Sequence, residues 1–444
     1  MVQLLHGLLA AATCAAVELL DPFADLLRWL RDDCGGMVAP DMIRASAGTR
    51  GVITRTEIAA HTVIALIPQS CILVSDPDGA DTDEHTLMAL RIMEGRAETT
   101  HRFYPYFATF PTDLSHFPIH WNSSQLSLLP PRGRTAVANV LHSWREDWER
   151  FLQRAARGRT VGKRFSFEDF KAARTLVTSR IFEVVVNGSY TLAMVPFGDL
   201  LNHAWNPAVN TEWSWFQAAQ AVRSPAAGSA HDPEGWHFTL RTSAVVAAGG
   251  ELHTSYGSRT QQTLLVDYGF TLPCGRSIGL ETSAGERCVD ELAYTLHNGA
   301  SATLRRPLFG ATFAQAIAVS AMRKAVRQAR GITRSRSSSM PSPQSVRELM
   351  QRVLASRPVG PVEARKRLAR AELGSPEFNA LNLHVGELSV AEAWIDASLE
   401  AETGAQHPTP ALASSHPGSV RSGGGILRAA ARLHDRIHRH DPRV

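Results

Sequence analysis

The chain has 444 residues, of which 44% are hydrophobic and 20% are charged. This composition is typical of packed globular domains and excludes a chain that is disordered throughout. The length is too great for one typical core and is enough for two or three domains. The formal net charge is only +4, so the charge balance does not demand a nucleic-acid partner.

The cysteines are few and scattered, without a CxxC pair: Cys14, Cys34, Cys71, Cys274 and Cys288. An odd, widely spaced set argues against a disulfide scaffold and against a zinc cluster. We therefore expect buried free thiols, as in a reducing compartment, and no metal site.

The first twenty residues are apolar but contain His6 and Glu18. A membrane span needs roughly 20 uninterrupted apolar residues. A secretory signal normally begins with positive charge, and none precedes His6. We expect a helical N-terminal extension, no membrane span, and a cytoplasmic or nuclear protein. Plastid or mitochondrial targeting by residues 1–20 stays open as the alternative.

Helix and strand signals then follow one another along the first 83 residues. Leu26, Leu27 and Leu30 stand at helical spacing, and Gly35-Gly36 ends the pattern, which predicts a short amphipathic helix over 19–33. Runs of β-branched residues predict strands at 51–55, 62–68 and 71–74.

Segment 84–180 is predicted to be helical. Trp144 and Trp148 lie four residues apart within it, on one helical face, and we expect both to pack in the core. The helices are predicted at 86–94, 126–129, 136–156 and 167–182.

Strand character returns after residue 190, and a second helical region begins after Pro273. The strands are predicted at 191–194, 210–216, 237–242 and 251–255, with a surface loop at 218–234. The later helices are predicted near 288–297, 314–329, 345–355, 362–373 and 390–402. Segments 334–343 and 407–425 are rich in Ser, Pro or Gly and are expected to be disordered.

The first motif with chemical content is Asp199-Leu-Leu-Asn202-His203. An Asn-His pair in an extended segment can present one side chain and successive backbone groups to the edge of a flat ligand. An adenine ring needs that combination of one acceptor and one donor. The alternative is that Asn202 pairs with buried backbone and that His203 is a core histidine.

The second motif is the strand end that carries Tyr256, followed by Tyr268-Gly269-Phe270. A phenol oxygen can accept CH···O contacts from a sulfonium methyl group and can orient an incoming amine. The faces of Tyr268 and Phe270 suit packing on adenine or around an alkyl amine. Core packing is the alternative for all three rings.

Two further segments complete the set. Gly48-Thr49-Arg50-Gly51 is a turn where backbone can approach a ligand closely, but a strand follows it, which disfavours a phosphate loop. Arg180 ends a predicted helix, where its guanidinium could hold the carboxylate of an amino-acid-like cofactor. A solvated surface arginine is the alternative.

The order of these motifs resembles that of the SET-domain protein methyltransferases, and most closely the class typified by the Rubisco large-subunit lysine methyltransferase. The resemblance implies an α+β fold, with a SET β-fold of short sheets, a knot-like crossing, a helical insertion and an all-α C-terminal domain. The domains implied are an N-terminal extension (1–25), the two parts of the SET core (26–83 and 181–273), the insertion (84–180), a helical substrate-binding domain (274–404) and a largely disordered tail (405–444).

The resemblance also implies that the cofactor is S-adenosyl-L-methionine. It places Gly48, Thr49 and Arg50 at the methionine end of the cofactor, with Arg180 nearby. It places Asp199, Asn202 and His203 at the adenosine part. Tyr256 would be the catalytic residue, and Tyr268 and Phe270 would complete the cofactor and lysine walls. There is no cysteine-rich segment after the core, so the zinc-bearing histone class is a poor match.

The expected reaction is methylation of lysine side chains on a non-histone protein. A histidine acceptor is the alternative within the same fold, and a catalytically silent protein-binding module is the alternative outside enzymology. Nucleic-acid binding through Arg365, Lys366, Arg367 and Arg370, or through Arg323, Lys324, Arg327 and Arg330, is the remaining rival, although basic helix faces are more often merely solvated.

Overall fold

A computed structural model describes most of the chain. The described residues are 21–44, 51–75, 83–154, 156–186, 189–205, 207–217, 235–257, 259–272, 291–295, 301–305, 326, 341–357 and 359–403. They belong to the first of two units into which the chain divides, Met1–Thr403 and Gly404–Val444. The predictions for residues 1–20, 45–50, 218–234, 334–340 and 405–444 therefore lie outside the described residues, as does all of 314–329 except Val326.

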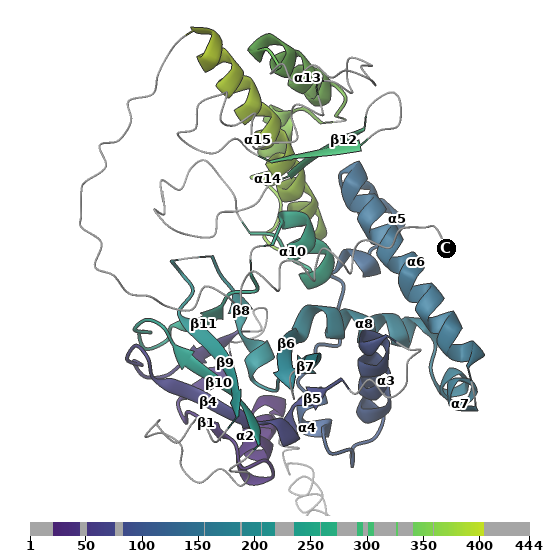
Figure 1. Cartoon of the computed structure of the whole chain (residues 1–444), viewed down its shortest axis with the longest axis vertical. Helices are drawn as coiled ribbons and strands as arrows, with labels where there is room; N and C mark the ends of the chain where they lie inside the picture. The colour runs from purple at the N-terminus through teal and green to yellow at the C-terminus, as the bar shows by residue number, and fades with distance from the viewer. Residues whose placement is uncertain are drawn as a thin grey trace, which may run out of the picture. The chain divides into compact units, whose positions relative to one another are not determined.

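The described strands form short sheets and no closed barrel (Figure 1). The first sheet has the order β1 (Met37–Val38), β4 (Val63–Pro68), β10 (Trp236–Thr242) and β9 (Thr211–Gln217). The second has the order β2 (Met42–Arg44), β3 (Val52–Thr54), β11 (Glu251–Thr254) and β8 (Asn202–His203). The third has the order β5 (Leu73–Val74), β7 (Ser189–Met194) and β6 (Ile181–Val186), and β12 (Glu291–Thr295) pairs with β13 (Ser301–Arg305).

Helices occupy segment 84–180, called the insertion below after the prediction for it, and the C-terminal region. In segment 84–180 they are α3 (Glu84–Arg96), α4 (Tyr104–Phe107), α5 (Ser123–Ser127), α6 (Pro131–Gln153), α7 (Ala156–Arg164) and α8 (Phe167–Arg180). The others are α2 (Pro22–Asp32), α10 (Gln261–Tyr268), α13 (Pro343–Ala355), α14 (Pro361–Leu368) and α15 (Pro376–Thr403). Three 3-10 turns lie at Gln69–Cys71, Pro118–His120 and Gly198–Leu200.

Local sequence explains where α2 begins and which face it buries. The Asp21 side chain accepts a hydrogen bond from the Phe23 N–H, and Pro22 occupies the first turn, where its missing N–H costs nothing. Leu26 and Leu30, four residues apart, are fully buried. The predicted helix over 19–33 is thus confirmed in the part that the structure describes.

The insertion packs through aromatic side chains. Trp144 and Trp148 are both buried, as expected, and the Trp148 ring stacks on Phe170 of α8 at a centroid distance of 5.2 Å. A serine at position 166 and an aspartate at position 169 cap α8 reciprocally, which sets its first residue.

Two predicted helices are wrong in part. The helix predicted at 167–182 ends at Arg180, because Ile181 begins β6, which pairs antiparallel with β7 along its whole length. The helix predicted near 288–297 is a strand over Glu291–Thr295, which pairs in register with Ser301–Arg305. In both cases cross-strand pairing overrides the local propensity.

The C-terminal helices are anchored directly behind the second motif. Asn379 of α15 accepts hydrogen bonds from the Thr271 N–H at 3.1 Å and from the Thr271 hydroxyl at 2.9 Å. Asn382, one turn later, donates to the Leu272 carbonyl at 2.9 Å. The segment that follows Phe270 is therefore held by α15.

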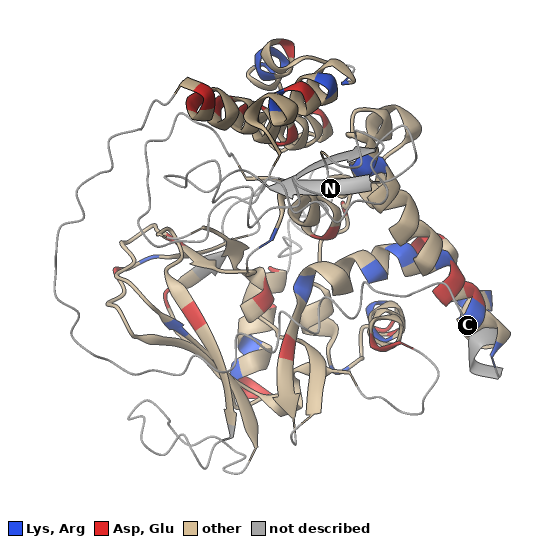
Figure 2. Cartoon of the chain, turned by 45° about the horizontal axis from the view of Figure 1, so that its top comes forward, with Lys and Arg blue, Asp and Glu red and all other residues tan. Residues whose placement is uncertain are grey.

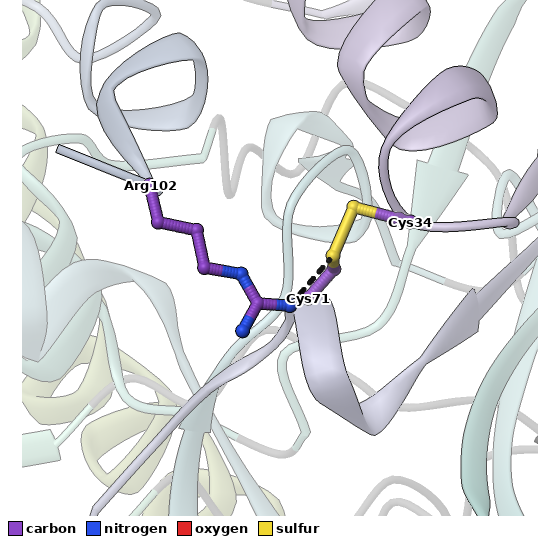
Figure 3. Close-up of a disulfide and its surroundings, with 3 residues drawn as sticks. All are labelled: Cys34, Cys71 and Arg102. Carbon is purple, nitrogen blue, oxygen red and sulfur yellow. Dashed lines mark hydrogen bonds between the residues drawn. A yellow bond between two sulfur atoms is a disulfide. The ribbon is translucent and has the colours of Figure 1, made fainter. Parts of the chain in front are cut away.

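The expectation of free thiols is wrong for Cys34 and Cys71, which form a disulfide (Figure 3). Cys34 follows α2, and Cys71 ends the turn after β4; the packing of these elements brings together two residues 37 positions apart. The Arg102 guanidinium lies 3.7 Å from the Cys71 sulfur. Sequence spacing alone did not indicate this proximity.

No described helix combines the length and the apolar character needed to cross a membrane. Within the same residues, no group of three or more His, Cys, Asp or Glu side chains is arranged to hold a metal ion.

Candidate functional site

The two motifs meet through a pair of short parallel strands. In β8 and β11, Asn202 lies opposite His253, and His203 lies opposite Thr254. The Ala204 N–H continues the contact by donating to the Thr254 carbonyl at 3.1 Å. This pairing carries Asn202 and His203 to the strand end from which Tyr256 follows.

Tyr256 is held against the Asn-His segment by its backbone, its ring and its hydroxyl group. Its N–H donates to His203 Nδ1 at 3.1 Å, and the two rings stack at 5.0 Å with an interplanar angle of 21°. Its hydroxyl donates to the Leu201 carbonyl at 2.8 Å. Because that hydrogen is directed at Leu201, the lone pairs of the phenol oxygen face away from it.

Tyr268 and Phe270 complete a cluster of four rings with His203 and Tyr256. The Tyr268 ring stacks on Tyr256 at 4.9 Å, and the Phe270 ring lies 6.4 Å from Tyr256 at an interplanar angle of 67°. Phe270 also lies 6.3 Å from His203. These offset and edge-to-face geometries are the favourable ones for aromatic pairs.

Gly269 allows the chain to present both neighbours to this cluster. It ends α10 in the left-handed region with φ +80°, where a side chain is strained. A Cβ atom there would lie 2.6 Å from His116 Cδ2 and 3.1 Å from the Phe117 ring. The helical insertion thus packs directly beneath this turn.

We expect Gly269→Ala to lower the thermal unfolding temperature more than Gly249→Ala does. Gly249 has a similar φ of +76°, but a Cβ atom there meets nothing within 4 Å. The αL strain of roughly 1 kcal/mol is common to both variants, so the difference measures the clash with His116. Equal shifts in a calorimetric or fluorescence melt would contradict the packing described.

Arg180 and Asp199 bind each other in the interior of the site. Arg180 Nη1 lies 2.8 Å from Asp199 Oδ2, and the side chains are 4% and 0% exposed. Tyr106, from the insertion, donates its hydroxyl to the same carboxylate oxygen at 2.8 Å. Burial first, and then the charge of Asp199, raise the pKa of Tyr106 well above its usual value, so this donor stays protonated.

Asn202 pairs with an acid on the neighbouring strand. Its Nδ2 donates to Glu251 Oε1 at 2.7 Å, and Glu251 Oε2 lies 3.4 Å from His253 Nε2. Gly51 approaches so closely that a Cβ atom there would lie 1.9 Å from Glu251 Oε1. Gly51, the residue that follows segment 45–50, therefore lies beside Asn202.

Three buried polar atoms in the site have no hydrogen-bond partner among the described residues: Arg180 Nε, Asp199 Oδ1 and His203 Nε2. His203 Nδ1 lies 3.1 Å from the Tyr256 nitrogen and 3.4 Å from the Thr254 carbonyl oxygen; the shorter bond, in which Nδ1 accepts, assigns the proton of the neutral imidazole to Nε2. Such unsatisfied groups are rare in protein interiors and are expected where a polar ligand supplies the partner. The residues present therefore fit a ligand with polar edges.

Burial sets the protonation states around the rings. Burial is the main reason that the pKa of His203 is lowered from 6.5 to about 4; the contact with the Thr254 backbone opposes this shift, and the charges of Arg259 and His253 add to it. Burial also raises the pKa of Asp267 from 3.8 to about 6 and raises the pKa of the Tyr268 hydroxyl. At neutral pH His203 is thus an uncharged ring beside Tyr256.

We expect the free energy of unfolding to fall as the pH drops from 6.5 towards 4. His203 has a folded-state pKa of about 4 against 6.5 for the ordinary group, so the unfolded chain binds the proton more tightly. The contribution of His203 to the free energy of unfolding is therefore fully present above pH 6.5 and is lost as the pH falls to about 4. For this one group the loss is about 3 kcal/mol.

The measurement is denaturant unfolding at a series of pH values. His203→Asn should flatten the pH dependence, whereas His142→Asn, at an exposed position on α6, should not. His120, which burial also gives a pKa of about 4, should keep part of the slope. An unchanged slope in His203→Asn would contradict the assignment.

The predicted site residues fall into three groups. Asn202, His203, Tyr256, Tyr268 and Phe270 are brought together. Arg180 and Asp199 are paired with each other, and the cofactor contacts predicted for them stay predictions. Gly48, Thr49 and Arg50 lie outside the described residues. The structure adds Tyr106 and Glu251: Tyr106 bonds across 93 positions, for which no local sequence signal exists, and Glu251 directly follows the Gly249-Gly250 turn.

The sequence matches no family model. It is 25% identical over 193 residues to the ribosomal lysine N-methyltransferase set10 of Schizosaccharomyces pombe, a match that covers 42% of this chain. The chain spans about a third of that relative, since the match covers 31% of its length.

Solved structures of Rubisco LSMT share the fold over nearly the whole chain. The SET domain of LSMT bound to lysine and AdoHcy superposes with a TM-score of 0.61 at 18% identity, over 87% of this chain and 92% of that one. Rubisco LSMT bound to sinefungin and monomethyllysine gives 0.58 at 17% identity, over 87% and 93%. Rubisco LSMT bound to AdoMet gives 0.57 at 17% identity, over 87% and 94%. The chain therefore has the SET-domain fold of LSMT, and the predicted α+β class is confirmed, although the C-terminal region that was expected to be all-α contains the strand pair β12–β13.

Proposed function

We propose that this chain is an S-adenosylmethionine-dependent protein N-methyltransferase that methylates lysine side chains of a non-histone protein. The observation that carries the proposal is the contact of Tyr256 with Leu201 and His203 inside a SET-domain fold. The LSMT structures with the same fold are described as bound to AdoMet, AdoHcy, lysine and monomethyllysine. The name of the yeast relative also specifies lysine N-methylation.

S-Adenosylmethionine supplies a methyl group on a positively charged sulfur. The Tyr256 hydroxyl donates its hydrogen bond to the Leu201 carbonyl, so the lone pairs of its oxygen point away from Leu201. These lone pairs can receive CH···O contacts from that methyl group. Asn202 and His203 hold the adenosine part, where the buried His203 Nε2–H is a donor for a ring acceptor. The ion pair between Arg180 and Asp199, together with the hydrogen bond from the Tyr106 hydroxyl to Asp199, holds the start of this segment in the protein interior.

The aromatic cluster favours the neutral form of the lysine amine that accepts the methyl group. Lysine has an ordinary pKa near 10.4, so most of it is protonated at neutral pH. The rings of Tyr256, Tyr268 and Phe270 offer no counter-charge to an ammonium group, and desolvation among them favours the neutral amine, whose proton leaves to water. Holding the amine in line with the methyl group is the main contribution expected of the site.

Charge on the C-terminal helices does not favour nucleic acid as the ligand. Lys and Arg occur on α13 and α14, whereas the charged residues of α15 are all Asp or Glu (Figure 2). Arg365 pairs with Glu392, and Arg367 lies 3.1 Å from Glu377. Because these cations already face carboxylates, the surface suits a protein partner better than a phosphate backbone.

The experiment is incubation of the purified protein with a cell lysate and radiolabelled S-adenosylmethionine, followed by mass spectrometric mapping of the labelled residue. We expect label on lysine of one or a few proteins. Label on histidine would assign the alternative acceptor. Absence of label, together with absence of calorimetric binding of the cofactor, would overturn the proposal in favour of a silent protein-binding module.

A further inference from the structure

Glu251 is a charged residue at the site and has no role in the reaction proposed above. Its carboxylate accepts from Asn202 Nδ2 at 2.7 Å and lies 3.4 Å from His253 Nε2, and its side chain is 27% exposed. Among the residues that the structure describes, no Lys or Arg lies within ion-pair distance of it. The negative charge at this position is thus not balanced by a permanent cation from the described part of the chain.

The pairing with Glu251 also fixes the orientation of the Asn202 amide. A carboxylate can only accept hydrogen bonds, so the NH₂ group of Asn202 must face Glu251 and its carbonyl oxygen must face away. The Glu251 carboxylate and the Asn202 carbonyl oxygen are therefore both acceptors, one on each of two neighbouring strands. An ammonium group has three donors and no acceptor, so it is the complementary ligand group.

The position of Glu251 along β11 decides which part of the donor it meets. It stands five residues before Tyr256, and a strand rises about 3.3 Å per residue, so the two Cα atoms are separated by up to about 16 Å. Between them lie Asn202 and His203, which pair with His253 and Thr254. Glu251 is thus separated from Tyr256 along the row, with Asn202 and His203 between them.

We propose that Glu251, together with Asn202, recognises the α-ammonium group at the amino-acid end of S-adenosylmethionine. This inference rests on the proposed function. Of the groups in the donor other than the sulfonium, the adenine is neutral, the α-carboxylate is anionic and the α-ammonium is cationic, so only the ammonium is attracted to the Glu251 carboxylate. Gly51 leaves room for this contact, because any Cβ atom at that position would displace Glu251 Oε1.

The test is calorimetric binding of S-adenosylhomocysteine and of its desamino analogue, which lacks only the α-ammonium group. In the unchanged protein we expect the analogue to bind about tenfold or more weakly. Glu251→Gln keeps an acceptor for Asn202 and removes the charge. It should weaken S-adenosylhomocysteine about tenfold and change the analogue by less than about threefold.

Two further variants separate charge from shape. Glu251→Asp keeps the carboxylate and should keep most of the preference for the amine, whereas Glu57→Gln removes an exposed acid elsewhere and should leave both affinities unchanged. A thermal melt of each variant checks folding. If Glu251→Gln does not fold, the preference of the unchanged protein for the amine should shrink as salt is added, because screening weakens the attraction.

The outcomes distinguish this inference from the proposed function. Equal weakening of both ligands by Glu251→Gln, or no weakening of either, would overturn the role of Glu251 while leaving cofactor binding in place. A preference for the amine that salt does not alter would also overturn it. An unchanged protein that binds neither ligand would overturn the proposed function itself.

Discussion

Replacement of Tyr256 by Phe is expected to lower the rate of methyl transfer by roughly 10²–10³-fold, which corresponds to the loss of about 3–4 kcal/mol of transition-state stabilisation. The variant keeps the ring that stacks on His203 and on Tyr268, and it loses only the hydroxyl oxygen that the proposal places against the methyl group. We therefore expect the affinity for S-adenosylhomocysteine to change by less than about threefold. The measurements are single-turnover methylation of the mapped substrate and calorimetric binding.

Tyr190→Phe is the matched control for this prediction. Its side chain is 54% exposed on β7, and removal of its hydroxyl should leave rate and affinity unchanged. A Tyr256→Phe variant with an unchanged rate would refute the catalytic assignment. A variant with greatly weakened binding would mean that the hydroxyl, through its bond to Leu201, chiefly shapes the cofactor site.

Replacement of Arg180 by Met is expected to lower the free energy of unfolding by about 3–5 kcal/mol. The variant leaves Asp199, which is 0% exposed, as a buried carboxylate whose remaining described side-chain donor is Tyr106. Removing one member of a buried ion pair costs more than removing both, because the other charge stays desolvated. Denaturant unfolding of Arg180→Met measures the loss.

The double variant Arg180→Met/Asp199→Leu should recover a large part of that loss, since both charges are removed together. Arg241→Met is the control, because its ion pair with Glu212 is about half exposed and should contribute at most about 1 kcal/mol. A double variant less stable than Arg180→Met would show that Asp199 stabilises the fold through Tyr106 and not through Arg180.

The sequence was informative where local pattern decides structure. Runs of β-branched residues predicted β3, β4, β7 and β10 close to their observed bounds. Helical spacing placed Trp144 and Trp148 in the core. The two motifs predicted that Asn202-His203 and Tyr256 meet, and the β8–β11 pairing brings them together.

The parts that sequence did not predict depend on contacts between distant residues. The Tyr106 hydroxyl reaches Asp199 across 93 positions, and Cys34 reaches Cys71 across 37. Neither pairing leaves a periodic signal. The helix predicted at 167–182 was two residues too long for a related reason, although Arg180 was also predicted to end a helix: Ile181 continues an apolar pattern, and its pairing with Met194 defines it as strand.

The position of Arg180 at the end of a helix was predicted from the sequence, but its ion pair with Asp199 was not. A guanidinium at the end of a helix is suited to a carboxylate, and the carboxylate that it meets in this structure is Asp199. Both residues were predicted from the sequence to contact the cofactor, and those contacts stay predictions. The pairing suggests that they support the Asn202-His203 segment from within.

The most direct test of the account is a crystal structure of the protein with S-adenosylhomocysteine. We expect the thioether sulfur to lie beside the hydroxyl oxygen of Tyr256, with the adenine edge against the backbone of Asn202 and His203. A ligand bound elsewhere on the molecule, or an adenosine part that leaves this segment untouched, would contradict it.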